Sequence, residues 1–510
     1  MHGILRIASR KSSLAKIQAY LVGNALQKIE PELKIEYHLK ESTGDKDLSS
    51  PLWKMSGKGV FTRDFREDLL SEKVDLVVHS WKDIDLDQND ETKVLSVLER
   101  VDQRDMLLFK RQFVFDSEIP NISIYSSSPR REYNLKSLLP EILPASLQKK
   151  EIIFQPVRGN IQTRLRKWQE DNDALGIVVA KAAIDRLFYT DYIQSEETEF
   201  TQLRQYLKVI LKSSVFMLLP ISECPNAPAQ GGLAAEIKKE RTEIITLVSR
   251  LTIPEVENSI TRERMELKKY GGGCHQKIGV GVLPKKHGIF FSLKGITDTG
   301  TVLNQLQLEK KHHFPKAESL EHLYPLKGNN LKFNREPLNV PENIPDANLI
   351  VARGNAWPNY WKQSNYDRII WAAGIKTWKE LAKKGIWVSG CSESLGEEEE
   401  FGLDLFLKYG NEFLKITHIE SENIDSQFDR YYTYKLELLN EIPDLSEKTH
   451  FFWMSGYQFD LVFQKNPSIC DKHHACGPGI TLSHISKQLG KGAKIDVFLN
   501  YEEWFKYHTS

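Results

Sequence analysis

Basic and hydroxyl side chains gather where short apolar runs of this sequence end. The runs span residues 5–8, 74–79, 122–125, 152–156 and 176–180. The side chains that follow them are Arg10, Ser12, Lys82, Ser127, Ser128, Arg130, Arg131, Arg158, Arg164 and Arg186. If the runs are parallel strands, their carboxyl ends meet at one edge of a sheet, which is where such sheets bind ligands. Several guanidinium groups there suit a ligand with many carboxylates or phosphates, because Arg donates paired hydrogen bonds and stays charged.

Asp83 is an acidic side chain among these basic ones, directly after Lys82. A carboxylate in that place can pair with positive charge that develops on a reacting molecule. Each residue alone has a plainer interpretation: Asp83 as a turn residue, a single Arg as a solvated surface group, and each Ser as a helix N-cap. The recurrence at successive strand ends favours a binding site for a polyanion.

Cys274 follows three consecutive glycines, Gly271, Gly272 and Gly273. A glycine loop lets a bulky group approach the backbone and leaves a thiol accessible, so Cys274 can form a covalent adduct. Taken alone, a single Cys is more often a small core residue than a reactive one.

Composition narrows the class of protein. The chain has 510 residues, more than one hydrophobic core usually serves, so we expect several domains. Lys plus Arg and Asp plus Glu number 69 each, so no global field attracts nucleic acid or an anionic membrane. The absence of a long apolar run and of a signal-peptide pattern predicts a cytoplasmic protein. Five sparse, irregularly spaced cysteines predict reduced thiols rather than disulfides.

The pattern of apolar runs predicts an α/β chain with a change of character along it. Through residues 4–222, β-branched runs alternate with helical periodicity, which is typical of a parallel sheet flanked by helices. Residues 223–312 predict a smaller α+β unit. Residues 313–345 lack periodicity and are rich in Pro and Asn, so we interpret them as a linker. Residues 346–510 again predict buried strands between helices.

Several motifs, in order, resemble those of porphobilinogen deaminases over residues 3–312. They are residues 6–12 (RIASRKS), 57–61 (GKGVF), 78–83 (VHSWKD), 104–105 (RD), 127–131 (SSPRR), 157–160 (VRGN), 163–165 (TRL), 229–231 (AQG) and 272–274 (GGC). The resemblance implies two periplasmic-binding-protein-like domains around a cleft and a small α+β domain that presents a cofactor cysteine. Domain 1 would comprise residues 1–99 and 200–222, domain 2 residues 100–199, and domain 3 residues 223–312.

The resemblance also implies the chemistry. A dipyrromethane cofactor would be attached to Cys274, and four porphobilinogen units would be joined to it and released as hydroxymethylbilane. Asp83 would stabilise cationic intermediates. The residues implied for cofactor binding are Cys274, Lys82, Arg130, Arg131, Ser127, Ser128 and Arg158, and those implied for substrate binding are Arg10, Ser12, Lys54, Lys58, Phe61, Arg164, Arg186 and Gln230. Trp81 and Pro129 depart from the family's pattern.

Residues 346–510 resemble uroporphyrinogen-III synthases, which convert hydroxymethylbilane into a macrocycle with one inverted ring. The matching segments are residues 373–377 (AGIKT), 432–435 (YTYK), 454–457 (MSGY), 475–481 (ACGPGIT) and 494–497 (KIDV). A Gly-Pro turn that opens a helix can bind carboxylates through backbone N–H groups. The site residues implied there are Gly477, Pro478, Thr481 and Ser455. Cys470, His473, His474 and Cys476 fit none of the usual zinc spacings, so no metal is predicted.

Two alternatives to a bifunctional enzyme stay open. The first is a deaminase whose C-terminal module is a scaffold without catalytic activity. The second is a bilobal protein that only captures an anionic solute, which would leave Cys274 without a purpose. The expected ligands are porphobilinogen and hydroxymethylbilane, with no nucleic acid and no membrane. A monomer is expected, although no sequence feature reports on oligomeric state.

Overall fold

The structure is a computed structural model that describes residues 3–41, 62–86, 90–114, 116, 118–188, 198–272, 276–310, 313–326, 330–407, 412–490 and 492–510. The chain forms two compact units. Unit 1 comprises residues 1–139, 150–284 and 291–305, and unit 2 comprises residues 140–149, 285–290 and 306–510. Among the described residues, no helix is both long and apolar enough to cross a membrane.

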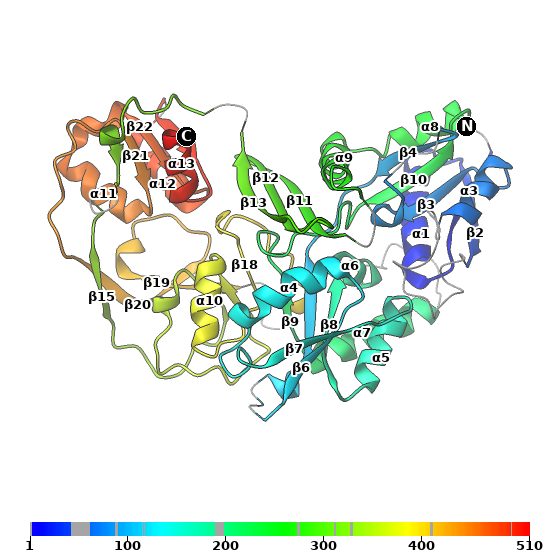
Figure 1. Ribbon diagram of the computed structural model, residues 1–510, viewed down its shortest axis with the longest axis horizontal. Helices are drawn as coiled ribbons and strands as arrows, with labels where there is room; N and C mark the ends of the chain where they lie inside the picture. The colour runs from blue at the N-terminus through cyan, green and yellow to red at the C-terminus, as the bar shows by residue number, and fades with distance from the viewer. Residues whose placement is uncertain are drawn as a thin grey trace. The chain divides into compact units, whose positions relative to one another are not determined.

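The first sheet of unit 1 has five strands in the order β2-β1-β3-β10-β4. These are β1 (Ile4–Arg10), β2 (Lys34–Lys40), β3 (Leu76–Ser80), β4 (Thr92–Val97) and β10 (Leu233–Lys238). β1 runs parallel to β2 and β3, whereas β10 runs antiparallel to β3 and β4. Helices α1 (Ser13–Ile29), α3 (Arg63–Leu70) and α8 (Thr242–Ser249) accompany this sheet (Figure 1). The core between α1 and the sheet contains Ile7, Val22, Leu26 and Leu76, each fully buried.

A second five-stranded sheet of unit 1 has the order β7-β6-β8-β5-β9. Its strands are β5 (Asp105–Lys110), β6 (Asn121–Tyr125), β7 (Glu151–Gln155), β8 (Ala174–Ala180) and β9 (Ser214–Leu218). β6 pairs parallel with β7 and β8, and β5 pairs antiparallel with β8 and β9. The accompanying helices are α4 (Pro129–Ile142), α5 (Ile161–Glu170), α6 (Lys181–Phe188) and α7 (Thr198–Ser213). The prediction of an α/β chain with several sheets is confirmed. Pro129 begins α4, where a missing N–H is tolerated.

Domain 1 was predicted to be completed by residues 200–222, but the strand pairing shows that the chain rejoins the first sheet later than that. β9 pairs with β5 in the second sheet, and the first sheet is rejoined only by β10, where His79 lies opposite Ala234. Both return strands are short apolar runs, and periodicity alone does not tell which sheet such a run joins.

Helix α9 (Pro254–Lys268) and a three-stranded sheet, β11-β12-β13, follow β10 along the chain. The strands are β11 (Lys277–Lys285), β12 (Gly288–Ile296) and β13 (Val302–Glu309). Glu263 of α9 is fully buried and joins distant parts of the chain. It accepts hydrogen bonds from the guanidinium of Arg100 at 2.7 and 3.0 Å, from Ala229 N at 2.8 Å and from Val282 N at 2.9 Å.

Unit 2 contains two further sheets. One has the order β14-β21-β22-β23, all parallel, from β14 (Leu323–Tyr324), β21 (His450–Trp453), β22 (His473–Cys476) and β23 (Lys494–Val497). The other has the order β15-β20-β19-β16-β17-β18, from β15 (Phe333–Pro337), β16 (Asn348–Val351), β17 (Ile370–Ala372), β18 (Gly390–Cys391), β19 (Phe413–His418) and β20 (Asp429–Leu438). Helices α10 (Ile375–Lys383), α11 (Gly456–Lys465), α12 (Ile480–Leu489) and α13 (Tyr501–Thr509) complete the unit.

The stretch 313–345 is not a bare linker, contrary to the sequence-based interpretation. Residues 323–324 form the edge strand β14, and residues 333–337 form the edge strand β15, which pairs antiparallel with β20. Both strands are short, and Pro325 and Pro337 lie beside or within them. Proline is tolerated at sheet edges, and such short edge strands leave almost no periodic signal.

His474 on β22 has its two ring nitrogens hydrogen-bonded in the core of unit 2. Its exposed fraction is 1 %, and Trp453 Nε1 lies 2.9 Å from Nδ1. Because an indole N–H can only donate, Nδ1 accepts and Nε2 carries the hydrogen, which it donates to the carbonyl of Ile469 at 2.9 Å. Burial lowers the pKa of His474 to about 4, so the folded protein keeps this imidazole neutral.

The stability of unit 2 should therefore decline as the pH falls from 6.5 to about 4. The unfolded chain takes up a proton at the ordinary pKa, whereas the folded chain takes it up only near the lowered one. The contribution, roughly 3 kcal/mol, is complete above pH 6.5 and is lost as the pH falls to 4. Urea unfolding at several pH values measures the decline, which should be shallower in His474→Gln. Equal declines in both proteins would contradict the assignment.

Candidate active site

A cavity in unit 1 gathers the ends of the strands. This cavity, called cavity 1, has a volume of about 780 Å³. The predicted residues that line it are Arg10, Ser12, Lys82, Asp83, Ser127, Ser128, Arg130, Arg131, Arg158, Arg164 and Gln230. They come from the segments after β1, β3, β6 and β7 and from the segment before β10. The structure thus brings together groups that the sequence separates by more than a hundred positions.

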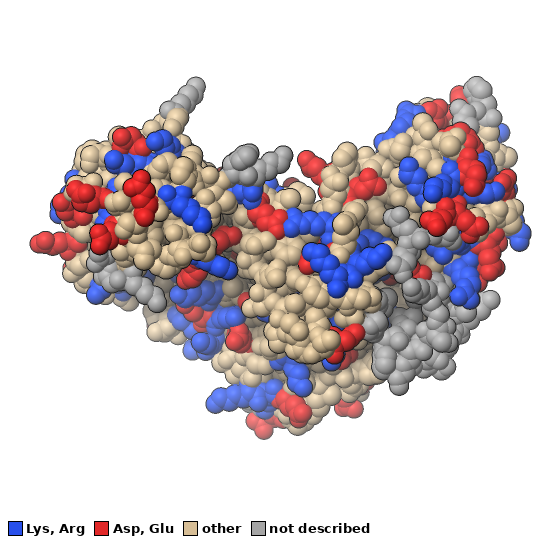
Figure 2. All heavy atoms as spheres, turned by 45° about the horizontal axis from the view of Figure 1, so that its top comes forward, with Lys and Arg blue, Asp and Glu red and all other residues tan. Residues whose placement is uncertain are grey.

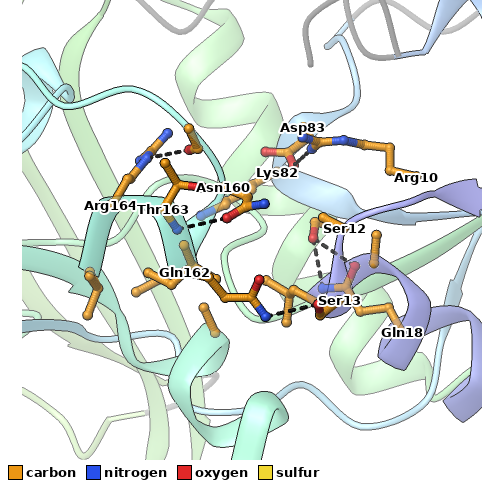
Figure 3. A pocket seen from close by; sticks show the side chains of 18 of the residues that line it. Arg10, Ser12, Ser13, Gln18, Lys82, Asp83, Asn160, Gln162, Thr163 and Arg164 are labelled. Carbon is orange, nitrogen blue, oxygen red and sulfur yellow. Dashed lines mark hydrogen bonds and ion pairs between the residues drawn. The ribbon is translucent and has the colours of Figure 1, made fainter. Parts of the chain in front are cut away.

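Asp83 lies in cavity 1 beside Arg10 (Figure 3). Its Oδ2 is 3.9 Å from Arg10 Nη1. The residue belongs to a short 3-10 turn, Trp81–Asp83, that follows β3 directly. Trp81 is buried among Ile84, Ala234 and other apolar side chains, and its backbone N–H donates to Gly232 at 3.1 Å. The buried indole therefore fixes the turn that presents Lys82 and Asp83.

Lys82 lines cavity 1 and lies next to Gln230. Lys82 Nζ lies 3.4 Å from Gln230 Oε1, and Gln230 Nε2 donates to Asp105 Oδ1 and to the carbonyl of Gln103, each at 2.8 Å. Burial lowers the pKa of Lys82 from its ordinary value. A half-buried ammonium in a cavity wall attracts an anionic ligand more strongly than a fully solvated one does, because less water screens its charge.

Asp105 holds the two neighbouring arginines, a role that the sequence analysis did not assign. It is fully buried at the start of β5, with Oδ2 2.8 Å from Arg130 Nη2 and Oδ1 2.7 Å from Arg131 Nη2. Burial alone would raise the pKa of Asp105, but Arg130 and Arg131 outweigh it and hold that pKa well below its usual range. One carboxylate thus orients two guanidinium groups, and the trio keeps a net positive charge.

The N-terminus of α5 forms another wall of cavity 1. Asn160 caps the helix by accepting a hydrogen bond from Thr163 N at 2.9 Å. Arg164 Nε donates to the carbonyl of Gly159 at 2.7 Å, and burial lowers the pKa of Arg164 to about 10. Gln162 Nε2 donates to Ser13 Oγ at 2.9 Å, which joins the first turns of α5 and α1 (Figure 3). Gln162 and Ser13 were missed because a polar residue in a first helical turn carries no distinctive signal.

Four predicted residues lie outside the described part of the chain: Lys54, Lys58, Phe61 and Cys274. Arg186 is described but is not among the residues that line cavity 1; its Nη2 donates to the carbonyl of Gly231 at 2.6 Å. The described part of the glycine loop has Gly271 at φ +91° and Gly272 at φ +66°. These left-handed conformations favour glycine, as expected for a tight turn ahead of Cys274.

The residues of cavity 1 fit a cofactor that carries carboxylates. Arg131 Nε is buried and has no hydrogen-bond partner among the described residues. Lys82, Arg130, Arg131, Ser127 and Ser128 all line this cavity. Elsewhere on the face drawn in Figure 2, Lys and Arg are interspersed with Asp and Glu. Since the chain has 69 basic and 69 acidic residues in total, the positive charge of cavity 1 is a local feature.

Residues 5–246 match the family model described as porphobilinogen deaminase, dipyromethane cofactor binding domain. A porphobilinogen deaminase of Chromobacterium violaceum is 32% identical over 274 residues, which are 54% of this chain and 78% of that protein. The chain belongs to the porphobilinogen deaminase family. The domain matched in this deaminase is the one that binds the dipyrromethane cofactor, which in this family is attached covalently to a cysteine.

Two further relatives agree with this assignment. The porphobilinogen deaminase of Lawsonia intracellularis is 33% identical over 60% of this chain and 89% of its own. That of Lachnospira eligens is 32% identical over 56% of this chain and 85% of its own. Among solved structures, the regulator HinK of Pseudomonas aeruginosa is 12% identical over 51% of this chain and 72% of its own, with a TM-score of 0.26. At that score the likeness supports no conclusion.

Unit 2 of this deaminase has a cavity of its own. Cavity 2 has a volume of about 920 Å³. Its charged lining residues are Arg335, Arg353, Lys376, Lys383, Lys384, Lys415, Glu380 and Glu397. Residues 373–377 line it, together with Met454, Pro478, Ile480 and Thr481. Gly477 and Ser455 are not among its lining residues; Ser455 instead caps α11 by accepting from Gln458 N at 3.2 Å.

Proposed function

We propose that unit 1 joins four porphobilinogen molecules into hydroxymethylbilane with release of ammonia, and that unit 2 closes this product to uroporphyrinogen III. The observation that carries the first step is cavity 1, which brings the half-buried carboxylate of Asp83 among several guanidinium groups. The second step rests on cavity 2, whose basic lining and matched segments suit the same polycarboxylate.

The residues of cavity 1 fall into two groups with different roles. Arg10, Arg130, Arg131, Arg158 and Arg164 bind the acetate and propionate groups, which accumulate as the chain of pyrroles grows. Asp83 pairs with the positive charge that develops on a pyrrole when its aminomethyl group departs as ammonia. When bound to Cys274, dipyrromethane supplies the pyrrole to which the first substrate unit is added.

Cavity 2 supports the synthase step through its own charge. Six basic side chains line it, and three of the segments that resemble uroporphyrinogen-III synthases meet there: 373–377, 454–457 and 475–481. Hydroxymethylbilane closes spontaneously to the isomer without the inverted ring. A cavity that binds the released product limits this loss, because bound hydroxymethylbilane is withdrawn from the spontaneous reaction.

The proposal is tested by intact mass and by product analysis. The purified chain should exceed its sequence mass by one dipyrromethane, and Cys274→Ser should lose that excess and the deaminase activity. Cys470→Ser is the matched control, since that thiol is exposed and does not line cavity 1. Incubation with porphobilinogen should yield predominantly uroporphyrin III after oxidation. An absent adduct would refute the deaminase step, and isomer I alone would reduce unit 2 to a scaffold.

A further inference from the structure

An ion pair between Glu397 and Lys415 lines cavity 2. Lys415 Nζ is 2.6 Å from Glu397 Oε2, and the other carboxylate oxygen accepts a hydrogen bond from Ser426 Oγ at 2.5 Å. The amide of Gln427 donates to the backbone carbonyl of Glu397. The exposed fractions of the two charged side chains are 8 % for Glu397 and 15 % for Lys415. The pair is therefore held rigidly and is mostly shielded from water.

Lys415 lies on an inner strand of its sheet. On β19 it is opposite Ile350 of β16 on one side and Arg430 of β20 on the other. Burial lowers the pKa of Lys415, and Glu397 opposes that shift by favouring the charged form. An ammonium in these surroundings gives up a proton more readily than a solvated lysine does, while the adjacent carboxylate keeps it protonated until then.

Neither packing nor ligand binding alone explains why the Glu397–Lys415 ion pair is present in the wall of cavity 2. Burying two charges costs more free energy than an apolar pair of the same size. A carboxylate in the wall of a cavity for a polycarboxylate also repels the ligand, which the other basic side chains would otherwise attract. Glu397 thus lowers both the stability of unit 2 and its affinity for a polycarboxylate, so its presence is explained only if it positions Lys415.

Building on the proposed synthase function, we infer that Lys415 is the proton donor for ring closure and that Glu397 positions it. The Lys415 ammonium gives one proton to the terminal hydroxyl of hydroxymethylbilane. The carbon–oxygen bond breaks, its electron pair leaves with the water, and the methylene carbon stays behind as a cation stabilised by its pyrrole. The carbon of the last pyrrole ring that already carries the bridging methylene attacks this cation. The bond from that carbon to the bridging methylene then breaks, its electron pair stays with the ring, and the free carbon on the other side of the same ring captures the released methylene cation, which inverts the ring. The proton that this ring sheds returns to the neutral Lys415 amine, so the net change is the loss of one water.

The test supplies hydroxymethylbilane directly to the full chain, so that it does not depend on unit 1. Lys415→Gln should lower kcat for isomer III by about 10²-fold and leave KM within a few-fold. Lys415→Arg should be equally slow, because a guanidinium keeps its charge but does not release its proton. Glu397→Gln should move the alkaline limb of the kcat–pH profile to lower pH, since the ammonium loses the partner that holds it charged.

Lys487→Gln is the matched control, because Lys487 is an exposed lysine paired with Asp425 at 2.9 Å. It should leave kcat, KM and the pH profile unchanged. Deaminase activity and the melting temperature check the folding of every variant. A wild-type chain that forms no isomer III would refute the proposed synthase function. An active wild type with an unchanged kcat in Lys415→Gln, or an unshifted profile in Glu397→Gln, would overturn the assignment of Lys415.

Discussion

The Asp83→Asn variant should form hydroxymethylbilane roughly 10²- to 10³-fold more slowly than the wild type. The amide has the shape of the carboxylate but no negative charge, so it cannot pair with a cationic pyrrole. Because Asp83 lies 3.9 Å from Arg10, its loss also leaves that guanidinium with one counter-charge fewer. Substrate carboxylates should therefore bind to the variant at least as tightly as to the wild type. The substitution should lower kcat and should not raise KM.

Single-turnover measurements of ammonia release separate the chemical step from product release in this variant. Asp173→Asn, at an exposed position before β8, is the matched control and should keep the wild-type rate. If Asp83→Asn retained a rate within threefold of the wild type, Asp83 would be a turn residue without a chemical role. Intact mass should be recorded in parallel, since a missing cofactor would lower the rate for a different reason.

Asp105→Ala should lower the free energy of unfolding of unit 1 by roughly 3–5 kcal/mol. The substitution leaves Arg130 and Arg131 buried at 4 % and 7 % exposure without their shared carboxylate. It also removes one of the two acceptors that orient Gln230 Nε2. Urea unfolding measures the loss, and the bound cofactor should be less well retained because both arginines are free to turn away.

Glu72→Ala is the control for Asp105→Ala, since Glu72 forms an exposed ion pair with Lys238 and should leave stability unchanged. The double variant Asp105→Ala, Arg130→Met should recover part of the loss, because it removes one of the two uncompensated charges. A single variant as stable as the wild type would show that the arginines find other partners or water.

The strand ends were predictable from sequence because their signal is local. A β-branched run followed by Arg, Lys or Ser is visible in a few residues, and the structure brings Arg10, Asp83 and Arg131 to one cavity. The role of Asp105 in orienting Arg130 and Arg131 was not predicted, because these side chains are 25 and 26 positions away in the sequence. Arg335 was missed because it lies on an edge strand inside a Pro-rich stretch. The Glu397–Lys415 pair joins a loop to an inner strand, a contact without any short-range pattern.

Strand β10 has a consequence for how the chain is made. It lies between β3 and β4, so these two strands of the first sheet cannot be joined until residues 233–238 have been synthesised. Until then, β3 and β4 each present an unpaired edge, which is a hazard for association with other nascent chains. Because the pairing spans more than a hundred positions, closure of this sheet is expected to be slow. The first sheet therefore completes its fold only after the residues of the second sheet have been synthesised.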